Sequence, residues 1–397
     1  MSKTKTNTNN VKFGLALSGG GSRAAAFHLG CMRALNDRGI LEKVSVISTV
    51  SGGSLIGAMW AYSDESFDEF DRRMQSVLRK GLINGIIRYT LFSSETLKII
   101  ATAATSGMLA MTCSSIRVLI SALRLLGLRS VSLQKLFTVL QAPLPRFASR
   151  TTAFSNYLEN KFFGSSTLRD VKRKGLNIVI NATELRTQSA FRYGSLESGC
   201  WRVGKLVDET LVAKAVASSA AFPALLPALD ENRRYIKRDG EAIVHRTIIS
   251  DGGVYDNLGT SCLIPKRDSK ISTNVTEVDF IIACVADQGI PDGAALPYFW
   301  PSRMYATVNT IHRRTHSMTY NLLHRLKMNG EIQGFLLPYL GQDDNKLPCP
   351  PSDLVPKEAT SDYPTDFDPM SQEALDLITK RGEQLTRNLI ETYYPEL

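Results

Sequence analysis

The chain reads FGLALSGGGSR over residues 13–23 and VSVISTVSGGS over residues 44–54. Each stretch is a short apolar run that ends in a cluster of glycines, and a helical pattern follows each cluster. A short apolar run bounded by glycine is typical of a buried strand, and residues 24–39 carry the period of a helix closed by Gly39. The two stretches therefore predict strand, glycine turn and helix, twice in succession.

The same alternation resumes in the second half of the chain. Strands are predicted at 176–185, 190–195, 246–250, 278–287 and 331–340, and helices at 208–220, 303–327 and 371–394. Asp208 and Ser371 are the predicted N-caps of two of these helices. Strands that alternate with helices indicate an α/β fold with a mostly parallel sheet and helices on both faces. Both glycine turns follow strands, at the edge where such sheets bind their ligands.

The net charge of +9 is concentrated in one segment. Residues 72–150 hold twelve basic residues and a single acid, Glu95, whereas the rest of the chain has a net charge of −2. The segment also contains eighteen consecutive uncharged residues at 99–116, rich in Thr, Ser and Ala, which is a weak pattern for a membrane span. A basic, apolar helical insert at about 66–165 favours an anionic membrane surface, although the pattern also fits a cap packed on the core.

Other partners and compartments have less support in the sequence. Aromatic residues that stack on bases are sparse in the basic segment, so no nucleic-acid partner is expected. Residues 1–10 are polar and predicted to be disordered, and they lack the apolar core of a Sec signal peptide. We therefore expect a cytoplasmic, peripherally membrane-associated protein, with export by a route without a Sec signal left open. The six cysteines lie at neither metal-ligand nor redox-motif spacing, so no zinc site or disulfide scaffold is expected.

The first glycine turn can gather backbone N–H groups at the start of a helix. Its sequence is Gly19-Gly20-Gly21-Ser22-Arg23-Ala24. Such a loop attracts negative charge, either the pyrophosphate of a dinucleotide, since the spacing matches G-x-G-x-x-A, or the oxyanion of an acyl-transfer intermediate. A dinucleotide site also needs an acid at the end of the second strand. That strand ends in Val50 and runs into Ser51, so the dinucleotide hypothesis is the weaker one.

The second glycine turn resembles a nucleophile elbow, G-x-S-x-G. Ser51 stands at its centre, Thr49 replaces the first glycine and Gly53 is the last. A serine on this strained turn projects from the backbone toward the start of the next helix. The alternative is an ordinary serine N-cap after a glycine turn.

A serine nucleophile needs a base. None of the five histidines stands in a clear loop after a predicted strand. Asp251 does, because it follows the strand predicted at 246–250 and precedes Gly252 and Gly253. An acid followed by two glycines permits a sharp turn and a close backbone approach. The alternative is a common Asp-Gly turn.

Four blocks in this order resemble the patatin-like phospholipases. They are GGGSR at 19–23, TVSGG at 49–53, ASSAAFPALLP at 217–227 and DGG at 251–253. The resemblance spans about residues 11–65 and 165–290, outside the basic insert. Two positions, Ala24 and Thr49, depart from the family pattern.

The resemblance implies a Ser–Asp dyad that needs neither metal nor cofactor. Ser51 would be the nucleophile and Asp251 the base. The backbone of Gly19, Gly20, Gly21, Ser22 and Arg23 would form the oxyanion hole, and the turns would be supported by Thr49, Gly53, Gly252 and Gly253.

The implied organisation is an acyl hydrolase domain over 11–330, interrupted by the insert, with a C-terminal extension at 331–397 packed on the same domain. The implied activity is that of a phospholipase A or lysophospholipase acting on phospholipid or lysophospholipid at a membrane surface. A catalytically silent lipid-binding or scaffold protein with this fold is the alternative.

Overall fold

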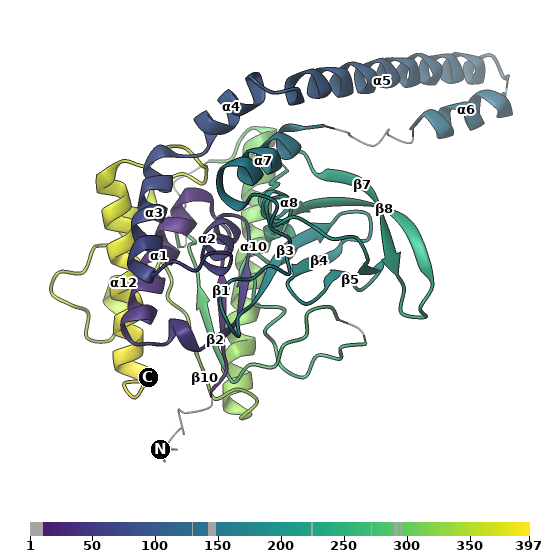
Figure 1. Cartoon of the computed structure of the whole chain (residues 1–397). Coiled ribbons are helices and arrows are strands. Elements are labelled where there is room, and N and C mark those ends of the chain that lie inside the picture. Colours follow the sequence, from purple (N-terminus) through teal and green to yellow (C-terminus); the bar gives the residue numbers. More distant parts are fainter. Residues whose placement is uncertain are drawn as a thin grey trace.

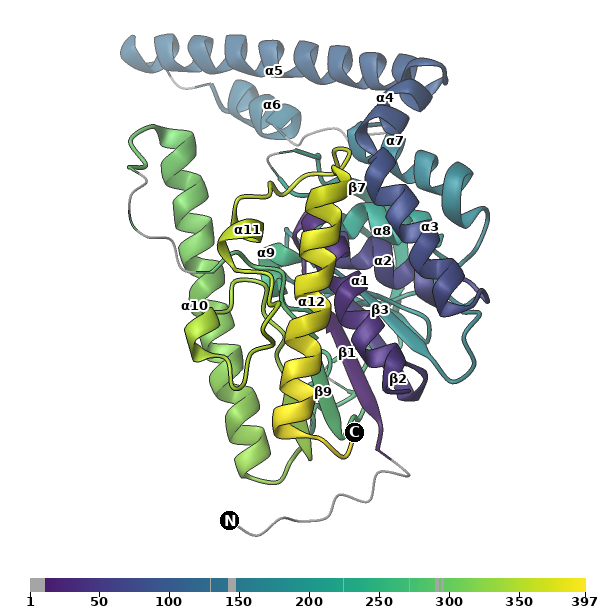
Figure 2. The same cartoon turned by 90° about the vertical axis from the view of Figure 1, so that its left-hand side faces the viewer.

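A computed structural model of the chain describes residues 11–128, 130–141, 148–223, 225–270, 272–289, 293 and 296–397. The segment 1–10, predicted to be disordered, lies outside the described residues. A ten-stranded sheet runs through the body, and helices cover both of its faces (Figures 1 and 2). This arrangement confirms the predicted α/β fold.

Five strands form the parallel part of the sheet, in the order β10, β9, β1, β2, β3. Their bounds are Phe13–Leu17 for β1, Val44–Thr49 for β2, Asn177–Glu184 for β3, Phe280–Cys284 for β9 and Gly334–Leu336 for β10. Both β1 and β9 are buried at every residue, which explains why they read as continuous apolar runs.

The rest of the sheet is antiparallel and closes back on β3. Its strands are β4 (Ser189–Gly194), β5 (Ser198–Cys200), β6 (Gly204–Leu206), β7 (Leu229–Ile236) and β8 (Ala242–Asp251). Each strand pairs with the next from β3 to β8, and β8 then pairs with the end of β3 that extends beyond β2. The predicted strands include β4 and part of β8 but none of the three strands between them.

Helices cover the two faces of the sheet unequally. One face carries α1 (Gly21–Asp37), α2 (Gly52–Ala61), α3 (Phe67–Lys80), α8 (Val212–Ser219) and α12 (Gln372–Tyr393), which share one hydrophobic cluster with the strands. The opposite face carries α10 (Trp300–Met328), whose Leu323 and Leu326 belong to a second cluster with strand residues such as Ile281.

Helix α8 begins later than predicted. The observed N-cap is Leu211, not Asp208. Leu211 forms an isolated β-bridge with Thr167, which keeps the backbone extended up to the helix. The Asp208 carboxylate instead accepts a hydrogen bond from the backbone N–H of Arg234 on β7, at 2.9 Å.

Helix α12 of the C-terminal extension packs against α1. A side chain at Gly30 of α1 would overlap the carbonyl oxygen of Thr379, and one at Gly382 of α12 would overlap that of Phe27. The two glycines therefore let the helix backbones approach closely. The fully buried Arg381 donates hydrogen bonds to the carbonyls of Leu340, Val355 and Gln342, which fastens the preceding loops to α12.

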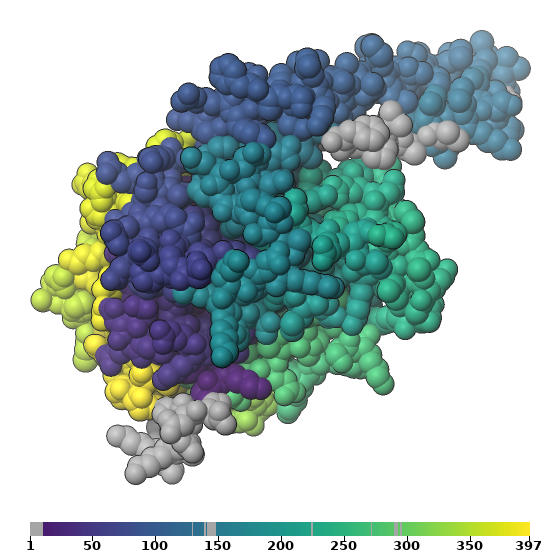
Figure 3. Space-filling model, in the orientation of Figure 1, coloured from purple at the N-terminus to yellow at the C-terminus, as the bar shows by residue number. Residues whose placement is uncertain are grey.

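The predicted helical insert stands out from the body. Its helices α4 (Ile83–Leu91), α5 (Glu95–Leu125) and α6 (Val131–Gln141) form a projection that we call the arm (Figures 1 and 3). Helix α7 (Arg150–Leu158) and the π-helical turn Glu159–Phe163 return the chain to the body. The remaining short helical segments are Leu41–Lys43, α9 (Gly253–Asp256), Asp344–Lys346 and α11 (Glu358–Ser361).

Candidate active site

Ser51 occupies a strained position between β2 and α2. Its φ of 49° and ψ of −116° lie in a region that side-chain-bearing residues rarely adopt. The backbone N–H of Ser51 donates to the hydroxyl of Ser219 at 3.0 Å, which holds the turn in place. Such strain at a serine between a buried strand and a helix is typical of a nucleophile elbow.

Close backbone packing explains the two glycines after Ser51. A side chain at Gly52 would overlap the carbonyl oxygen of Gly21, and a side chain at Gly53 would overlap that of Leu17. The elbow therefore lies directly against the glycine-rich loop and the end of β1. Only glycine allows this contact without moving one backbone away from the other.

The structure also accommodates Thr49, which replaces the first glycine of the elbow pattern. Its hydroxyl donates to the carbonyl of Val179 at 3.3 Å and accepts from the hydroxyl of Ser54 at 3.0 Å. Its methyl group fills the space where a side chain at Gly57 would lie. The larger side chain at residue 49 is thus accommodated by the glycine at position 57 of α2.

The register of β3 brings Asp251 to the elbow. Thr49 of β2 pairs with Ile180, and Asp251, the last residue of β8, pairs with Ala182 on the same edge of β3. Ser51 therefore leaves β2 next to the point where β8 ends. The Ser51 hydroxyl lies close enough to the Asp251 carboxylate to lower its pKa, although two hundred residues separate them in the sequence.

The Asp251 carboxylate is buried, with 3% of the residue exposed. Burial raises its pKa to about 7, and this effect is only partly opposed by the hydrogen bond from the Gly253 backbone N–H, at 2.6 Å, and by the nearby Ser51 hydroxyl. The turn after Asp251 is tight because a side chain at Gly252 would overlap the carbonyl oxygen of Asn181. The site therefore holds a carboxylate that can change protonation state near neutral pH.

The glycine-rich loop offers two free donors. Gly20 and Gly21 have φ of 141° and 60°, and neither N–H has an acceptor among the described residues. The N–H of Gly19 donates to the Asn257 carbonyl at 3.1 Å, and that of Ser22 donates to the Asp366 carbonyl at 2.7 Å. Ser22, which we expected among the oxyanion donors, is therefore already occupied by the C-terminal extension.

Arg23 anchors the loop instead of facing a substrate. Its guanidinium is buried and donates to the carbonyl of Ala286 at 3.1 Å and to that of Tyr363 at 2.8 Å. It thus ties the start of α1 to the end of β9 and to the C-terminal extension.

Two supporting residues were not identified from the sequence. The Ser219 hydroxyl accepts from the Ser51 N–H and donates to the Asn181 carbonyl at 2.6 Å. Ser219 lies within the ASSAAFPALLP block, which the resemblance singled out without a role. The Asn257 side-chain oxygen lies where side chains at Gly19 or Gly253 would be, so it joins the loop to the D-G-G turn.

No histidine makes a hydrogen bond with Ser51 or Asp251. The histidines that could serve as a base contact other groups. His28 is fully buried and contacts the Ser18 carbonyl at 2.9 Å, and burial lowers its pKa to about 4. His316 lies 3.6 Å from Asp287, and burial lowers the pKa of His312. Within the described ranges, no cluster of His, Cys, Asp or Glu could hold a metal ion.

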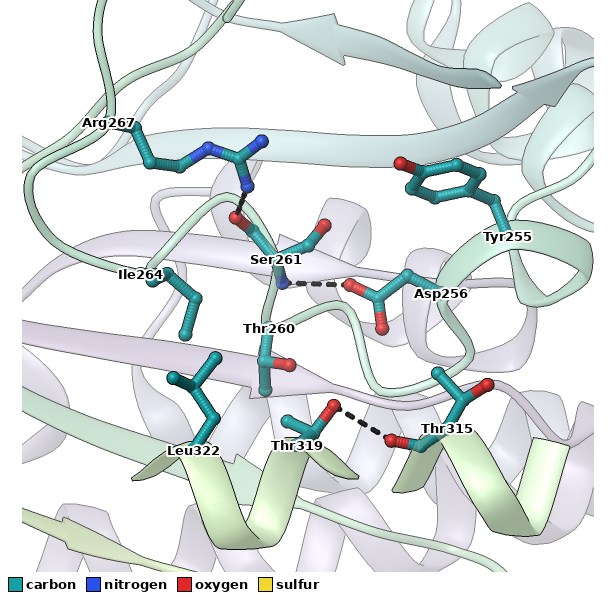
Figure 4. Close-up of a pocket in the computed structure, with 9 residues that line it drawn as sticks. All are labelled: Tyr255, Asp256, Thr260, Ser261, Ile264, Arg267, Thr315, Thr319 and Leu322. Atoms are coloured by element: carbon teal, nitrogen blue, oxygen red, sulfur yellow. Dashed lines mark hydrogen bonds between the residues drawn. The ribbon is translucent and has the colours of Figure 1, made fainter. Parts of the chain in front are cut away.

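A cavity of about 380 Å³ lies beyond the D-G-G turn, between the chain that follows it and α10 (Figure 4). It is lined by Tyr255, Asp256, Thr260, Ser261, Ile264, Arg267, Thr315, Thr319 and Leu322. The Asp256 carboxylate is used internally, since it accepts from the N–H of Ser261 at 2.8 Å. Neither Ser51 nor Asp251 lines this cavity.

The family model described as "Patatin-like phospholipase" matches residues 15–264, which is more than half of the chain. The chain belongs to the patatin-like phospholipase family. This match confirms the resemblance found in the motifs and supports a hydrolase of the phospholipase type. Among curated proteins, none matches the chain.

Solved structures with a similar fold are distant in sequence. Human GIVD cytosolic phospholipase A2 is 10% identical, with a TM-score of 0.47, and the match covers 95% of this chain and 61% of the human chain. VipD from Legionella pneumophila is 14% identical, with a TM-score of 0.35, and the match covers 96% of this chain and 67% of VipD. The type III effector ExoU, a Pseudomonas aeruginosa protein, is 14% identical, with a TM-score of 0.32, and the match covers 96% of this chain and 53% of ExoU. The chain thus spans 61% of the human enzyme's length.

Proposed function

We propose that the protein hydrolyses the carboxylic ester of a phospholipid or lysophospholipid through Ser51 and Asp251. The observation that carries the proposal is the approach of the Ser51 hydroxyl to the Asp251 carboxylate, beside the N–H groups of Gly20 and Gly21, which have no acceptor among the described residues. Together they supply a nucleophile, a base and an oxyanion hole within one small region. The proposal needs no metal, because backbone N–H groups stabilise the developing negative charge.

The reaction would proceed in two balanced halves. Ser51 Oγ attacks the ester carbonyl while Asp251 takes its proton, and the N–H groups of Gly20 and Gly21 donate to the oxyanion. Asp251 then returns the proton to the leaving alcohol as the carbon–oxygen bond breaks. A water molecule attacks the acyl-enzyme in the same way, giving its proton to Asp251, which passes it back to Ser51.

The pKa of Asp251 predicts a pH profile. Only the ionised carboxylate accepts the serine proton, and burial raises its pKa to about 7. We expect kcat/KM for a p-nitrophenyl acyl ester to rise about tenfold per pH unit below that value and to level off above it. Initial rates between about pH 5 and pH 9 measure this. A profile that stays flat to the acid end would show that a carboxylate of ordinary pKa, or another base, does the work.

The arm is proposed to place the enzyme on an anionic membrane surface. Within the described parts of the chain, α5 is the one helix long and apolar enough to cross a membrane, and one such helix is weak evidence for a span. None of its most apolar window is buried against the protein. Large exposed apolar side chains continue on either side of it, among them Leu91, Phe92, Leu125, Leu126 and Val131. Exposed apolar area on this scale, in a strongly basic segment, is typical of a lipid-binding surface.

Charge placed at the arm is expected to weaken membrane binding selectively. Phe92 and Leu125 are 88% and 90% exposed, so Phe92→Glu and Leu125→Glu should leave the fold intact. Loss of one buried apolar side chain corresponds to about tenfold weaker binding to vesicles that contain phosphatidylglycerol. Cosedimentation measures this, and turnover of a soluble ester should not change. The matched control is Val244→Glu, an exposed apolar residue on β8; equal losses in all three variants would contradict a specific role for the arm.

A further inference from the structure

The N-terminal end of α10 carries an exposed aromatic cluster that the proposed chemistry does not use. Leu296 is 89% exposed and Trp300 is 74% exposed. We call the cluster the aromatic tip; it consists of Leu296, Tyr298, Phe299, Trp300, Met304 and Tyr305. Six large apolar side chains within ten residues make an unusual amount of apolar surface to leave in water.

The charge of the same region is one-sided. Residues 296–314, which hold the tip and the first half of α10, contain Arg303, Arg313 and Arg314 and no Asp or Glu. One of these bases belongs to the tip, since the Arg303 guanidinium lies over the ring of Tyr298 with its carbon 5.9 Å from the ring centroid. Trp and Tyr are the side chains that favour the boundary between lipid headgroups and acyl chains, and Lys and Arg favour anionic headgroups.

The tip and the arm lie at the same end of the molecule. Figure 2 shows the N-terminal end of α10 beneath the arm, on the side where the parallel strands end. Ser51 and Asp251 lie at that same edge of the sheet, because Ser51 follows β2 and Asp251 pairs with the end of β3. Apolar, basic surface is therefore present at two places around the edge that carries the candidate dyad.

We propose that the aromatic tip is a second membrane-contact surface, which enters the headgroup region of an anionic bilayer while the arm binds beside it. The inference rests on the proposed function, because it assumes that the dyad acts on lipid. Two separated contacts fix the orientation of a protein on a surface, whereas a single contact leaves it free to rotate. With both in place, the edge that holds Ser51 and Asp251 faces the bilayer, and the second contact binds at high effective concentration.

Tryptophan fluorescence tests this without requiring catalysis. The chain has three tryptophans: Trp60 is buried at 6% exposed, Trp201 is 37% exposed on the body and Trp300 belongs to the tip. Protein carrying Ser51→Ala is mixed with vesicles of dibrominated phosphatidylcholine and phosphatidylglycerol in equal parts, so that the lipid is not consumed. Bromine quenches a tryptophan only when the indole enters the bilayer. We expect quenching that is lost in Trp300→Phe and kept in the matched variant Trp201→Phe.

Vesicle affinity supplies a second measurement. Trp300→Ala is expected to bind phosphatidylglycerol vesicles about tenfold more weakly, the loss that corresponds to one buried aromatic side chain. Trp201→Ala is expected to bind like the unsubstituted protein. Because Trp300 is 74% exposed, the variant is expected to keep its fold, and its far-ultraviolet circular dichroism and melting curve check this directly.

The possible outcomes separate the inference from the proposed function. Vesicle binding that leaves Trp300 unquenched would overturn the second contact but keep the arm and the hydrolase proposal. Failure to bind vesicles at all would overturn both membrane contacts. The hydrolase proposal would still be tested separately, by the effect of Ser51→Ala on hydrolysis of a soluble ester. Trp300 emission that shifts with protein concentration in the absence of vesicles would assign the tip to a second copy of this chain and would also overturn the inference.

Discussion

Ester hydrolysis is expected to be lost in both Ser51→Ala and Asp251→Asn. Removal of the nucleophile should lower kcat by several orders of magnitude, and removal of the base by about a hundredfold to ten-thousandfold. The double variant should be no worse than Ser51→Ala, because the two side chains act in one step. Initial rates on a p-nitrophenyl acyl ester and on a lysophospholipid measure all three variants.

Matched controls distinguish lost chemistry from a lost fold. Ser63 lies just beyond the other end of α2, and Asp376 is exposed on α12, so Ser63→Ala and Asp376→Asn should keep full activity. Activity that survives in Ser51→Ala would contradict the nucleophile assignment. Activity that survives in Asp251→Asn would contradict the assignment of Asp251 as the base for Ser51.

The melting temperature gives Asp251→Asn a second readout, in the opposite direction to activity. Burial raises the Asp251 pKa from 3.8 to about 7, so between these values the folded state holds a proton that the unfolded state has released. The free energy of unfolding therefore falls as pH rises through this window, and the neutral asparagine avoids that loss. We expect Asp251→Asn to melt at a higher temperature than the unsubstituted protein at about pH 8, and at a similar temperature at about pH 4.

Gly52→Ala is expected to reduce activity strongly without touching a reacting group. Its new methyl group would overlap the Gly21 carbonyl oxygen and force the elbow away from the oxyanion loop. A shift of about 1 Å between a nucleophile and its partners costs about a hundredfold in rate. Rates on the soluble ester measure the loss.

The control for Gly52→Ala is the same change in open space. Gly107 is exposed within α5, and a side chain there would meet no atom within 4 Å. Gly107→Ala should therefore keep activity and stabilise its helix by about 1 kcal/mol. Full activity in Gly52→Ala would show that the two loops need not touch for the reaction to occur.

Much of the parallel core could be predicted because its signals are local. Strands β1, β2 and β9 are buried runs of apolar residues, and glycines mark the turns after β1 and β2. The amphipathic period and the Ser371 cap likewise located α12 to within a residue at each end. Such features depend on residues that are neighbours in the chain.

The antiparallel strands β5, β6 and β7 were missed because their pairing is not local and their residues are ambiguous. β5 and β6 have three residues each, too few for a period, and β7 reads LDENRRYI, a polar sequence that resembles a loop. The paired partners, not the sequence of each strand, determine these elements. Their omission matters for the site, since the closure of β8 on β3 is what delivers Asp251 to Ser51.

Side chains of the candidate site were easier to predict than its backbone contacts. Ser51 and Asp251 were identified from motifs, and the structure brings them together. The Asp366 carbonyl that occupies the Ser22 N–H, and the Asn257 carbonyl that occupies the Gly19 N–H, had no signal in the sequence. Every residue carries a carbonyl, so residue type does not reveal which one will act as the acceptor.

The most direct test of the central claim is covalent labelling of the serine. A fluorophosphonate that carries an alkyl chain is incubated with the protein, and the modified peptide is identified by mass spectrometry. The account predicts a single adduct on Ser51, formed far more slowly in Asp251→Asn because the hydroxyl then lacks its base. An adduct on another residue, or a labelling rate that does not depend on Asp251, would contradict it.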